Sequence, residues 1–159
     1  MKLVLNKEYA RRHLFVTIVM AALGLWFGYD GFVRYPATPA AELYRSIEGS
    51  DAPEGFDLEG FKRQKTQTQY GFTALSLLAA LVVGLRLYGA SRFKFEFDEN
   101  GFSFRNRRYT YADIDETDHR QWKSKSILKL RLKDGLRVVL DAWHHVGVKE
   151  FEARLVRKR

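Results

Sequence analysis

The chain has 159 residues, with 27 lysines and arginines against 19 acidic residues and a formal net charge of +8. This length allows one folded domain together with a membrane anchor. The sequence contains no cysteine, which excludes disulfides, zinc–thiolate sites and thiol nucleophiles.

The N-terminal half contains two uncharged apolar runs of 16 residues, at positions 14–29 and 70–85. A helix of that length spans roughly 24 Å, so flanking residues must help each run to cross a hydrocarbon core of about 30 Å. We therefore expect two transmembrane helices at about residues 13–33 and 69–89. The aromatic residues near their ends suit the membrane interface: Trp26, Tyr29, Tyr70 and Tyr88. The alternative, two core helices of a soluble protein, would leave too little chain to cover them.

A cleaved signal peptide is a second alternative for the first run. Its leader is positively charged, because Lys2, Lys7, Arg11 and Arg12 precede the apolar residues. However, no small-x-small cleavage site follows Tyr29. We therefore expect this run to remain as a membrane anchor.

Basic residues are concentrated toward both ends of the chain. Residues 1–13 carry four basic residues and one acidic residue, and the segment from Arg86 onward carries 18 basic and 11 acidic residues. The intervening segment 30–69 carries five basic and seven acidic residues. The positive-inside rule therefore predicts an integral plasma-membrane protein with both termini in the cytoplasm and an extracytoplasmic loop at residues 34–68.

This loop is expected to be partly helical. Pro39 can occupy the first position of a helix that ends at Gly49. After a turn at residues 50–55, Asp57 can cap a second helix that continues into the second apolar run. Asp30, at the outer end of the first span, is expected to be an interface residue.

From residue 93 the hydrophobic period changes to two, which is typical of half-buried strands. Apolar residues alternate with charged ones in two stretches: Phe93, Phe95 and Phe97, and then Leu128, Leu130 and Leu132. Asn100-Gly101 and Asp134-Gly135 predict the turns of two hairpins. With further strands at residues 107–111 and 114–119, at least five strands are expected.

The C-terminal residues return to a helical period. Val148, Phe151 and Leu155 share one face of a helix that would close the sheet. The basic residues that follow suit the C-terminus of a helix.

An antiparallel sheet closed by one helix, behind a transmembrane hairpin, resembles the pleckstrin-homology-like (PH-like) domains of small bacterial membrane proteins. The matching stretches are FEFDENGFSFRNRRYTYADID, SILKLRLKDGLRVVLDAW and VKEFEARL, within about residues 90–157. The expected fold class is therefore an α-helical membrane hairpin at residues 1–89 followed by a small α+β, PH-like cytoplasmic domain at 90–159. This region of about 70 residues is shorter than a typical domain of about 100, so we expect some strands to be missing or supplied by another chain. The resemblance implies a binding or scaffolding module of the bacterial inner membrane, without a cofactor or catalytic residues.

Basic and aromatic residues of this domain are candidate contacts for lipid or for a protein partner. They are Arg105, Arg107, Arg108, Arg120, Trp122, Lys123 and Lys125. A solvent-exposed face that only keeps the domain soluble is the alternative. The positive charge would also suit nucleic acid, but no recognition helix accompanies it, and we expect no nucleic-acid partner.

No metal site is expected. His144 and His145 are adjacent, and Asp141 or His119 could approach them, but neighbouring residues of a strand point to opposite faces. The same alternation argues against a calcium site in the acidic cluster of the domain, which consists of Asp113, Asp115, Glu116 and Asp118.

Two functional hypotheses follow. The first is a non-enzymatic, membrane-anchored interaction module, an accessory or assembly subunit of a larger membrane complex. The second is an anionic-lipid-responsive module whose basic domain reads the cytoplasmic leaflet. Neither needs a small-molecule substrate. Self-association is also considered, because Gly24-x-x-x-Gly28 has the spacing of a helix-packing motif, although the same residues could pack the hairpin against itself.

Overall fold

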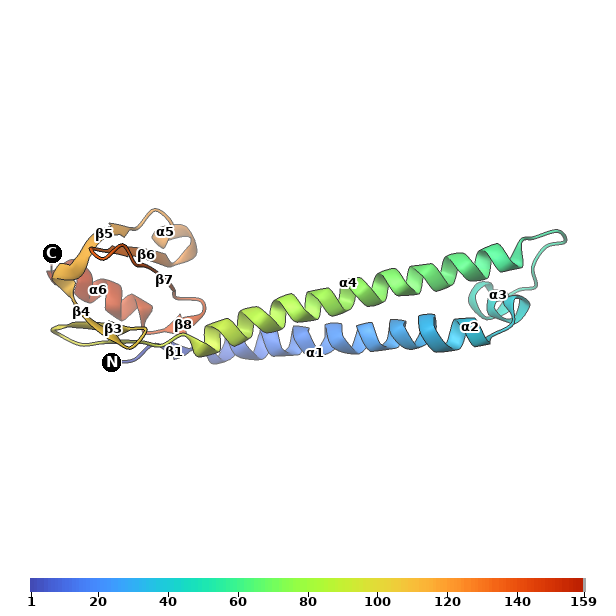
Figure 1. Ribbon diagram of the computed structural model, residues 1–159, viewed down its shortest axis with the longest axis horizontal. Coiled ribbons are helices and arrows are strands. Elements are labelled where there is room, and N and C mark those ends of the chain that lie inside the picture. The colour runs from blue at the N-terminus through green and yellow to red at the C-terminus, as the bar shows by residue number, and fades with distance from the viewer. Residues whose placement is uncertain (159) are drawn as a thin grey trace. The chain divides into compact units, whose positions relative to one another are not determined.

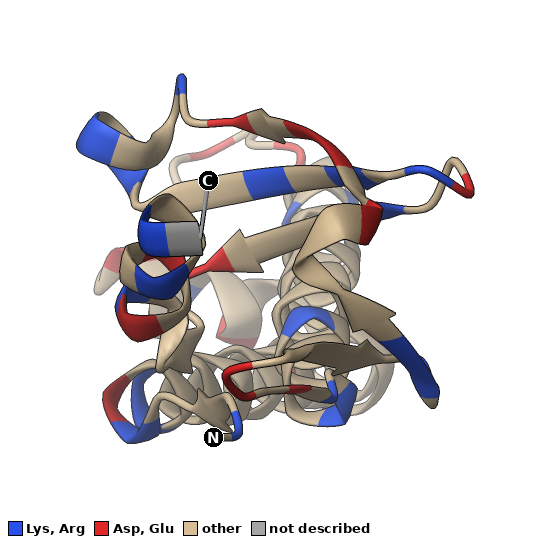
Figure 2. Ribbon diagram, turned by 90° about the vertical axis from the view of Figure 1, so that its left-hand side faces the viewer, with Lys and Arg blue, Asp and Glu red and all other residues tan. Residues whose placement is uncertain are grey.

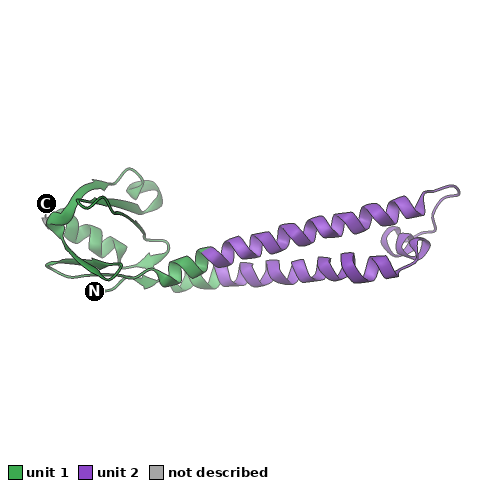
Figure 3. Ribbon diagram, viewed as in Figure 1, with its two compact units in different colours: residues 1–12, 86–159 green, residues 13–85 purple. Residues whose placement is uncertain are grey.

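The computed structural model describes residues 1–158 and divides into two compact units (Figure 3). The first, which we call the hairpin unit, contains His13–Leu85. The second, the sheet unit, contains Met1–Arg12 and the chain from Arg86 onward. The sequence-based division near residue 89 assigned residues 1–12 to the hairpin, whereas the structure groups them with the sheet.

Two long helical segments run side by side in the hairpin unit (Figure 1). The first combines α1 (Lys7–Tyr29), the π-helix η1 (Asp30–Arg34) and α2 (Tyr35–Ala37), and the second is α4 (Leu58–Arg92). With 31 and 35 residues, both are long and apolar enough to cross a membrane. Only 17% and 11% of their most apolar stretches are buried within the protein, whereas the core helix of a soluble protein is mostly buried.

Glycines of the first helical segment allow α4 to approach closely. A Cβ atom on Gly24 would lie 2.6 Å from Cδ2 of Leu77, and one on Gly31 would lie 3.0 Å from Cδ1 of Tyr70. Gly28 faces Thr73 at an ordinary contact distance. The Gly24-x-x-x-Gly28 pair therefore packs the hairpin against itself, which was one of the two roles considered for it.

The connection between the long helices follows the sequence-based expectation closely. Helix α3 (Ala40–Glu48) ends at Gly49, whose φ of +74° is the left-handed conformation that glycine adopts without strain. Oδ1 of Asp57 accepts a hydrogen bond from the backbone N–H of Gly60 at 2.8 Å, which caps α4 as predicted. Pro39 precedes α3 as its N-cap rather than occupying its first position.

Within residues 1–158, the sheet unit contains eight short strands, all of which pair antiparallel. They are β1 (Val4–Leu5), β2 (Phe95–Phe97), β3 (Gly101–Phe104), β4 (Arg107–Thr110), β5 (Ile114–Asp118), β6 (Ile127–Leu132), β7 (Arg137–Asp141) and β8 (His145–Val146). Two of the three sheets have the orders β2-β3-β4 and β5-β6-β7, and the third is the pair β1-β8. Both predicted hairpin turns are confirmed.

The expected single sheet of five or more strands is wrong, because the chain bends between β4 and β5. There Thr110 and Asp113 form a capping box around the 3₁₀ turn η2 (Tyr111–Asp113). The register of β5 on β6 then shifts between Ile114 and Glu116. A turn of this kind redirects the chain, so β5 pairs with β6 and not with β4.

Residues 1–5 complete the sheet unit from the other end of the chain. The N–H of Leu3 donates to the carbonyl oxygen of Phe95 at 2.9 Å, and the N–H of Phe97 donates to that of Met1 at 2.7 Å. The side chain of Leu3 is only 2% exposed. We expected some strands to be missing or supplied by another chain. Instead, the N-terminus of the same chain supplies an additional strand.

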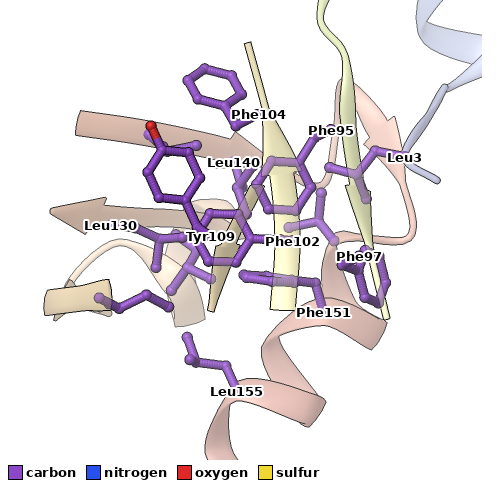
Figure 4. Close-up of a cluster of buried hydrophobic side chains, with 14 of the residues drawn as sticks. Leu3, Phe95, Phe97, Phe102, Phe104, Tyr109, Leu130, Leu140, Phe151 and Leu155 are labelled. Atoms are coloured by element: carbon purple, nitrogen blue, oxygen red, sulfur yellow. The ribbon is translucent and has the colours of Figure 1, made fainter. Parts of the chain in front are cut away.

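Aromatic side chains fill the space between the sheets and α6 (Val148–Lys158) (Figure 4). The ring of Phe151 packs edge-on against Phe95 and Phe97, with centroids 5.0 and 5.3 Å away. Val148 and Leu155 are buried with Phe151, which confirms the predicted face of the closing helix. The leucines at alternate positions of β6 are buried as the two-residue period predicted.

Candidate functional site

A short segment of the sheet unit, residues 141–146, contacts the first turns of α1. The backbone N–H of Asn6 donates to the carbonyl oxygen of His144 at 2.8 Å. Its side-chain amide donates to the carbonyl oxygen of Trp143 at 3.2 Å, while its Oδ1 accepts from the N–H of Glu8 at 2.9 Å. Asn6 thus pairs with a backbone N–H at the start of α1 that has no partner within the helix. It also connects the start of α1 to residues 141–146, and we call this segment the joint.

The joint also holds the end of α4. Nε2 of His145 lies 3.0 Å from the carbonyl oxygen of Ala90. Because a carbonyl oxygen only accepts, Nε2 carries the proton. The ring is 5% exposed and packs against Phe93 at 4.8 Å. Burial lowers the pKa of His145, and the contact with Ala90 opposes this only in part, so the imidazole is neutral at pH 7.

His144 makes a separate contact with α1. Its ring lies 4.4 Å from that of Tyr9, which is buried. The two adjacent histidines therefore serve different helices, His144 the start of α1 and His145 the end of α4.

The exposed side of this region combines arginines with half-exposed aromatic rings. The guanidinium of Arg12 lies 5.8 Å from the ring centre of Trp143, and that of Arg92 lies 5.2 Å from the ring centre of Tyr88. Both distances are those of cation–π contacts. We call this set the rim, and it comprises Arg11, Arg12, Arg86, Tyr88, Arg92 and Trp143.

Two of the predicted contact residues have partners within the sheet unit. Arg108 donates to both carboxylate oxygens of Asp98 at 2.5 Å. Arg120 donates from Nε and Nη2, one to each carboxylate oxygen of Asp118, at 3.1 and 2.9 Å, and these bonds lower the pKa of Asp118 to about 2. The positive charges of Arg108 and Arg120 are therefore largely balanced in place.

The other predicted residues lie on two separate elements. Arg105 and Arg107 flank the β3–β4 turn, and Lys123 and Lys125 lie in the short helix α5 (Trp122–Lys125). Trp122 packs against the core instead of projecting from it. The structure does not gather the seven residues into one patch, and Figure 2 shows basic and acidic segments interspersed over the strands.

The histidines and acidic residues considered as metal ligands have other contacts. Nε2 of His119 lies 3.5 Å from Glu152, and His144 lies 3.7 Å from Asp141. Asp115 and Glu116 pair with Arg131. Among residues 1–158, no group of three or more His, Asp or Glu side chains is placed to hold an ion.

Asp30 differs from the expectation of an interface residue, because it is buried in the hairpin unit. Its carboxylate accepts a hydrogen bond from Nε1 of Trp26 at 3.2 Å and lies 3.5 Å from the guanidinium of Arg34. Trp26, Asp30 and Arg34 follow one another at intervals of four residues along one helical segment. Both partners of the Asp30 carboxylate therefore come from its own helix.

Comparison with protein-family models, curated proteins and solved structures gives no match. Membership of the PH-like family therefore stays a prediction from the sequence pattern. Function has to be argued from the residues of the joint, the rim and the sheets.

Proposed function

We propose that the protein is a non-enzymatic, membrane-anchored interaction module, an accessory or assembly subunit of a larger membrane complex. In this proposal the two long helical segments cross a bacterial inner membrane as a hairpin. The sheet unit and both termini face the cytoplasm, and α3 lies outside. Large apolar side chains exposed along both helices support insertion, since lipid would cover them.

The joint is the observation that carries this proposal. One segment of six residues holds the start of α1 through Asn6 and the end of α4 through Ala90. A domain attached by a flexible linker would leave both helix ends free of such contacts. A partner bound to the sheet unit would therefore bind the compact unit that contains the start of α1 and the end of α4, which suits an accessory subunit anchored by these helices.

Unpaired strand edges offer a surface for the protein partner. Within the described chain, β4 and β7 each pair with one neighbouring strand only. β7 also exposes Val139 on its outer side. An extended segment of a partner could add to such an edge through main-chain hydrogen bonds.

A second candidate function is an anionic-lipid-responsive module. It is favoured by the exposed charges of Arg105, Arg107, Lys123 and Lys125, for which no ion pair is found among residues 1–158. Each such charge near an anionic leaflet contributes about 1 kcal/mol of attraction. In this case the loops of the sheet unit, and not its strand edges, would be the functional surface.

Topology can be tested directly because the chain has no native cysteine. Single cysteines at Ser50 and Ser124 would lie in the α3–α4 connection and in α5, and both positions are exposed. A membrane-impermeant maleimide should label Ser50→Cys in intact cells and Ser124→Cys only after permeabilisation. The reverse pattern would overturn the orientation, and labelling of both in intact cells would overturn the hairpin.

The two functions are separated by purifying the full-length chain from native membranes in mild detergent. The interaction module predicts a stoichiometric protein partner that is lost with Val139→Glu and kept with Lys123→Glu/Lys125→Glu. The lipid-responsive module predicts that Val139→Glu changes nothing. It also predicts that the full-length chain, held in neutral-lipid nanodiscs, binds added anionic liposomes in a salt-dependent way, and that the lysine variant, with Arg107→Glu, abolishes this binding.

A further inference from the structure

We infer that the rim is a binding surface for anionic phospholipid headgroups, a role that the sequence suggested for the loops of the sheet unit. This inference rests on the proposed insertion of the hairpin and goes further, because it names the class of lipid and the residues. Three observations carry it: the charge balance of the rim, the geometry of its rings and its place along the helices.

The arginines of the rim are poor in acidic partners. Among residues 1–158, no ion pair is found for Arg11, Arg86 or Arg92. In contrast, Arg108, Arg120 and Arg131 elsewhere in the sheet unit each pair with at least one carboxylate, although, within the described residues, Arg105 and Arg107 do not. Exposed guanidinium groups without an acidic partner in the described chain, at the start of α1 and the end of α4, are available to an external anion, and the planar guanidinium matches phosphate in a bidentate geometry.

Two aromatic rings beside these arginines are half exposed, although they are large enough to be buried in a core. Trp143 is 50% exposed and Tyr88 57% exposed. Each has a guanidinium against its face, from Arg12 and Arg92. A ring with one apolar face and one polar edge is stable at the depth of lipid headgroups, and it leaves the outer N–H groups of the arginine available to phosphate.

The rim borders the apolar runs directly. Arg11 and Arg12 stand just before the run that begins at residue 14, and Arg86 follows the run that ends at residue 85. In an inserted hairpin these positions fall at the headgroup level. This continuity with lipid-covered helix surface favours a phospholipid over a soluble phosphate compound or an acidic protein segment.

Glu8 opposes this arrangement. Its carboxylate pairs with Arg12, one helical turn further on. It neutralises part of the positive charge of the rim. Removing the carboxylate of Glu8 should therefore increase the selectivity for anionic lipid, whereas removing an arginine of the rim should decrease it.

Tryptophan quenching tests the inference on the full-length chain in lipid nanodiscs. Two single-tryptophan proteins are needed: Trp26→Phe/Trp122→Phe retains Trp143 at the rim, and Trp122→Phe/Trp143→Phe retains Trp26 within the first span. Each is placed in phosphatidylcholine with an equal fraction of either brominated phosphatidylglycerol or brominated phosphatidylcholine. Trp143 should be quenched more by the anionic lipid, while Trp26 should be quenched by both.

Matched arginine variants of the Trp143 protein then assign the selectivity. If one arginine contributes about 1 kcal/mol, that arginine alone enriches anionic lipid beside it about fivefold. Arg86→Gln/Arg92→Gln should remove most of it, and Glu8→Gln should increase it. Arg108→Gln/Arg120→Gln removes the same formal charge from residues of the sheet unit outside the rim and should leave the selectivity unchanged. Circular dichroism verifies that each variant is folded.

The outcomes separate this inference from the proposed function. Equal quenching of Trp143 by both brominated lipids, with normal quenching of Trp26, would overturn the rim as an anionic-lipid site and leave the inserted hairpin standing. Equal loss of selectivity in the Arg108/Arg120 variant would also overturn it, since the effect would then be one of net charge. No quenching of Trp26 by either lipid would overturn membrane insertion, and the inference with it.

Discussion

The imidazole of His145 donates a hydrogen bond to the carbonyl oxygen of Ala90, 55 residues earlier in the chain, at a distance of 3.0 Å. Ala90 lies in the last turn of α4, where carbonyl groups lack partners within the helix. This carbonyl oxygen also accepts a longer hydrogen bond from the backbone N–H of Phe93, at 3.4 Å. The buried ring of His145 gives it a second, shorter partner and joins the end of α4 to the strand β8.

Replacing His145 by alanine should destabilise the sheet unit. The change removes the hydrogen bond and the packing against Phe93, and it leaves the carbonyl oxygen of Ala90 with only the longer bond from the N–H of Phe93. We expect a loss of about 1–3 kcal/mol in the free energy of unfolding, from chemical denaturation in detergent. His144→Ala is the matched control, because its ring is more exposed and its loss should cost less. Equal costs for the two variants would contradict the role given to His145.

The stability of the protein should depend on pH through the same residue. The pKa of His145 is lowered by burial, from an ordinary value of 6.5. The unfolded chain then binds a proton that the folded chain does not, so the contribution is fully present above pH 6.5 and is lost as the pH falls through the folded pKa. Unfolding measured at several pH values below 7 should show this slope, and His145→Gln should remove it. A slope of the same size in His145→Gln would assign it to other groups.

A second loss of stability should follow at lower pH from Asp118. The pKa of this carboxyl is lowered from 3.8 to about 2 by its hydrogen bonds with Arg120. Its contribution is therefore present above pH 3.8 and lost as the pH falls toward 2, well below the range of His145. Arg120→Gln should shrink the acid-side slope between these values and leave the slope near pH 6 unchanged. An Arg120→Gln curve that matches the parent below pH 4 would contradict this assignment.

Local patterns were sufficient to predict most elements of the sheet unit. Asn100-Gly101 marked the first hairpin turn, and the spacing of Val148, Phe151 and Leu155 marked the buried face of α6. The division into three sheets could not be predicted, because it depends on the capping box at Thr110, which ends one sheet and redirects the chain. Alternation within a strand carries no information about which neighbour the strand will pair with.

The joint and the rim were largely missed for a related reason. Residues 1–5 contain only the two-residue strand β1 and an isolated bridge at Lys2, which are too short to show a period, and their partners are distant in sequence. One local signal was present, since Asn6 stands directly before α1 and asparagine is a favoured N-cap residue. The roles of Trp143 and His145 depend on tertiary contacts with the helix ends and have no sequence pattern of their own.

The packing of the hairpin can be tested at Gly24. A Cβ there would lie 2.6 and 2.8 Å from the side chain of Leu77, which must then move. Gly24→Ala should lower the stability of the hairpin by roughly 1–3 kcal/mol, as overpacking of a close contact does. Gly71→Ala is the matched control, because nothing lies within 4 Å of the added atom, and its better helix propensity should raise stability slightly. Both are measured by denaturation in mixed detergent micelles, and a stabilised Gly24→Ala would contradict the close approach of the two helices.

The N-terminal strand provides the sharpest test of how the sheet unit is built. Leu3 is 2% exposed in the core beside Phe95, whereas the next residue, Val4, is 56% exposed. Leu3→Ala should therefore cost about 2–5 kcal/mol in the free energy of unfolding, the range for a buried leucine. Val4→Ala should change it by less than about 0.5 kcal/mol, as expected for a surface site. If both substitutions prove equally mild, residues 1–5 are not part of this core, and the start of α1 is not tied to the sheet unit through them.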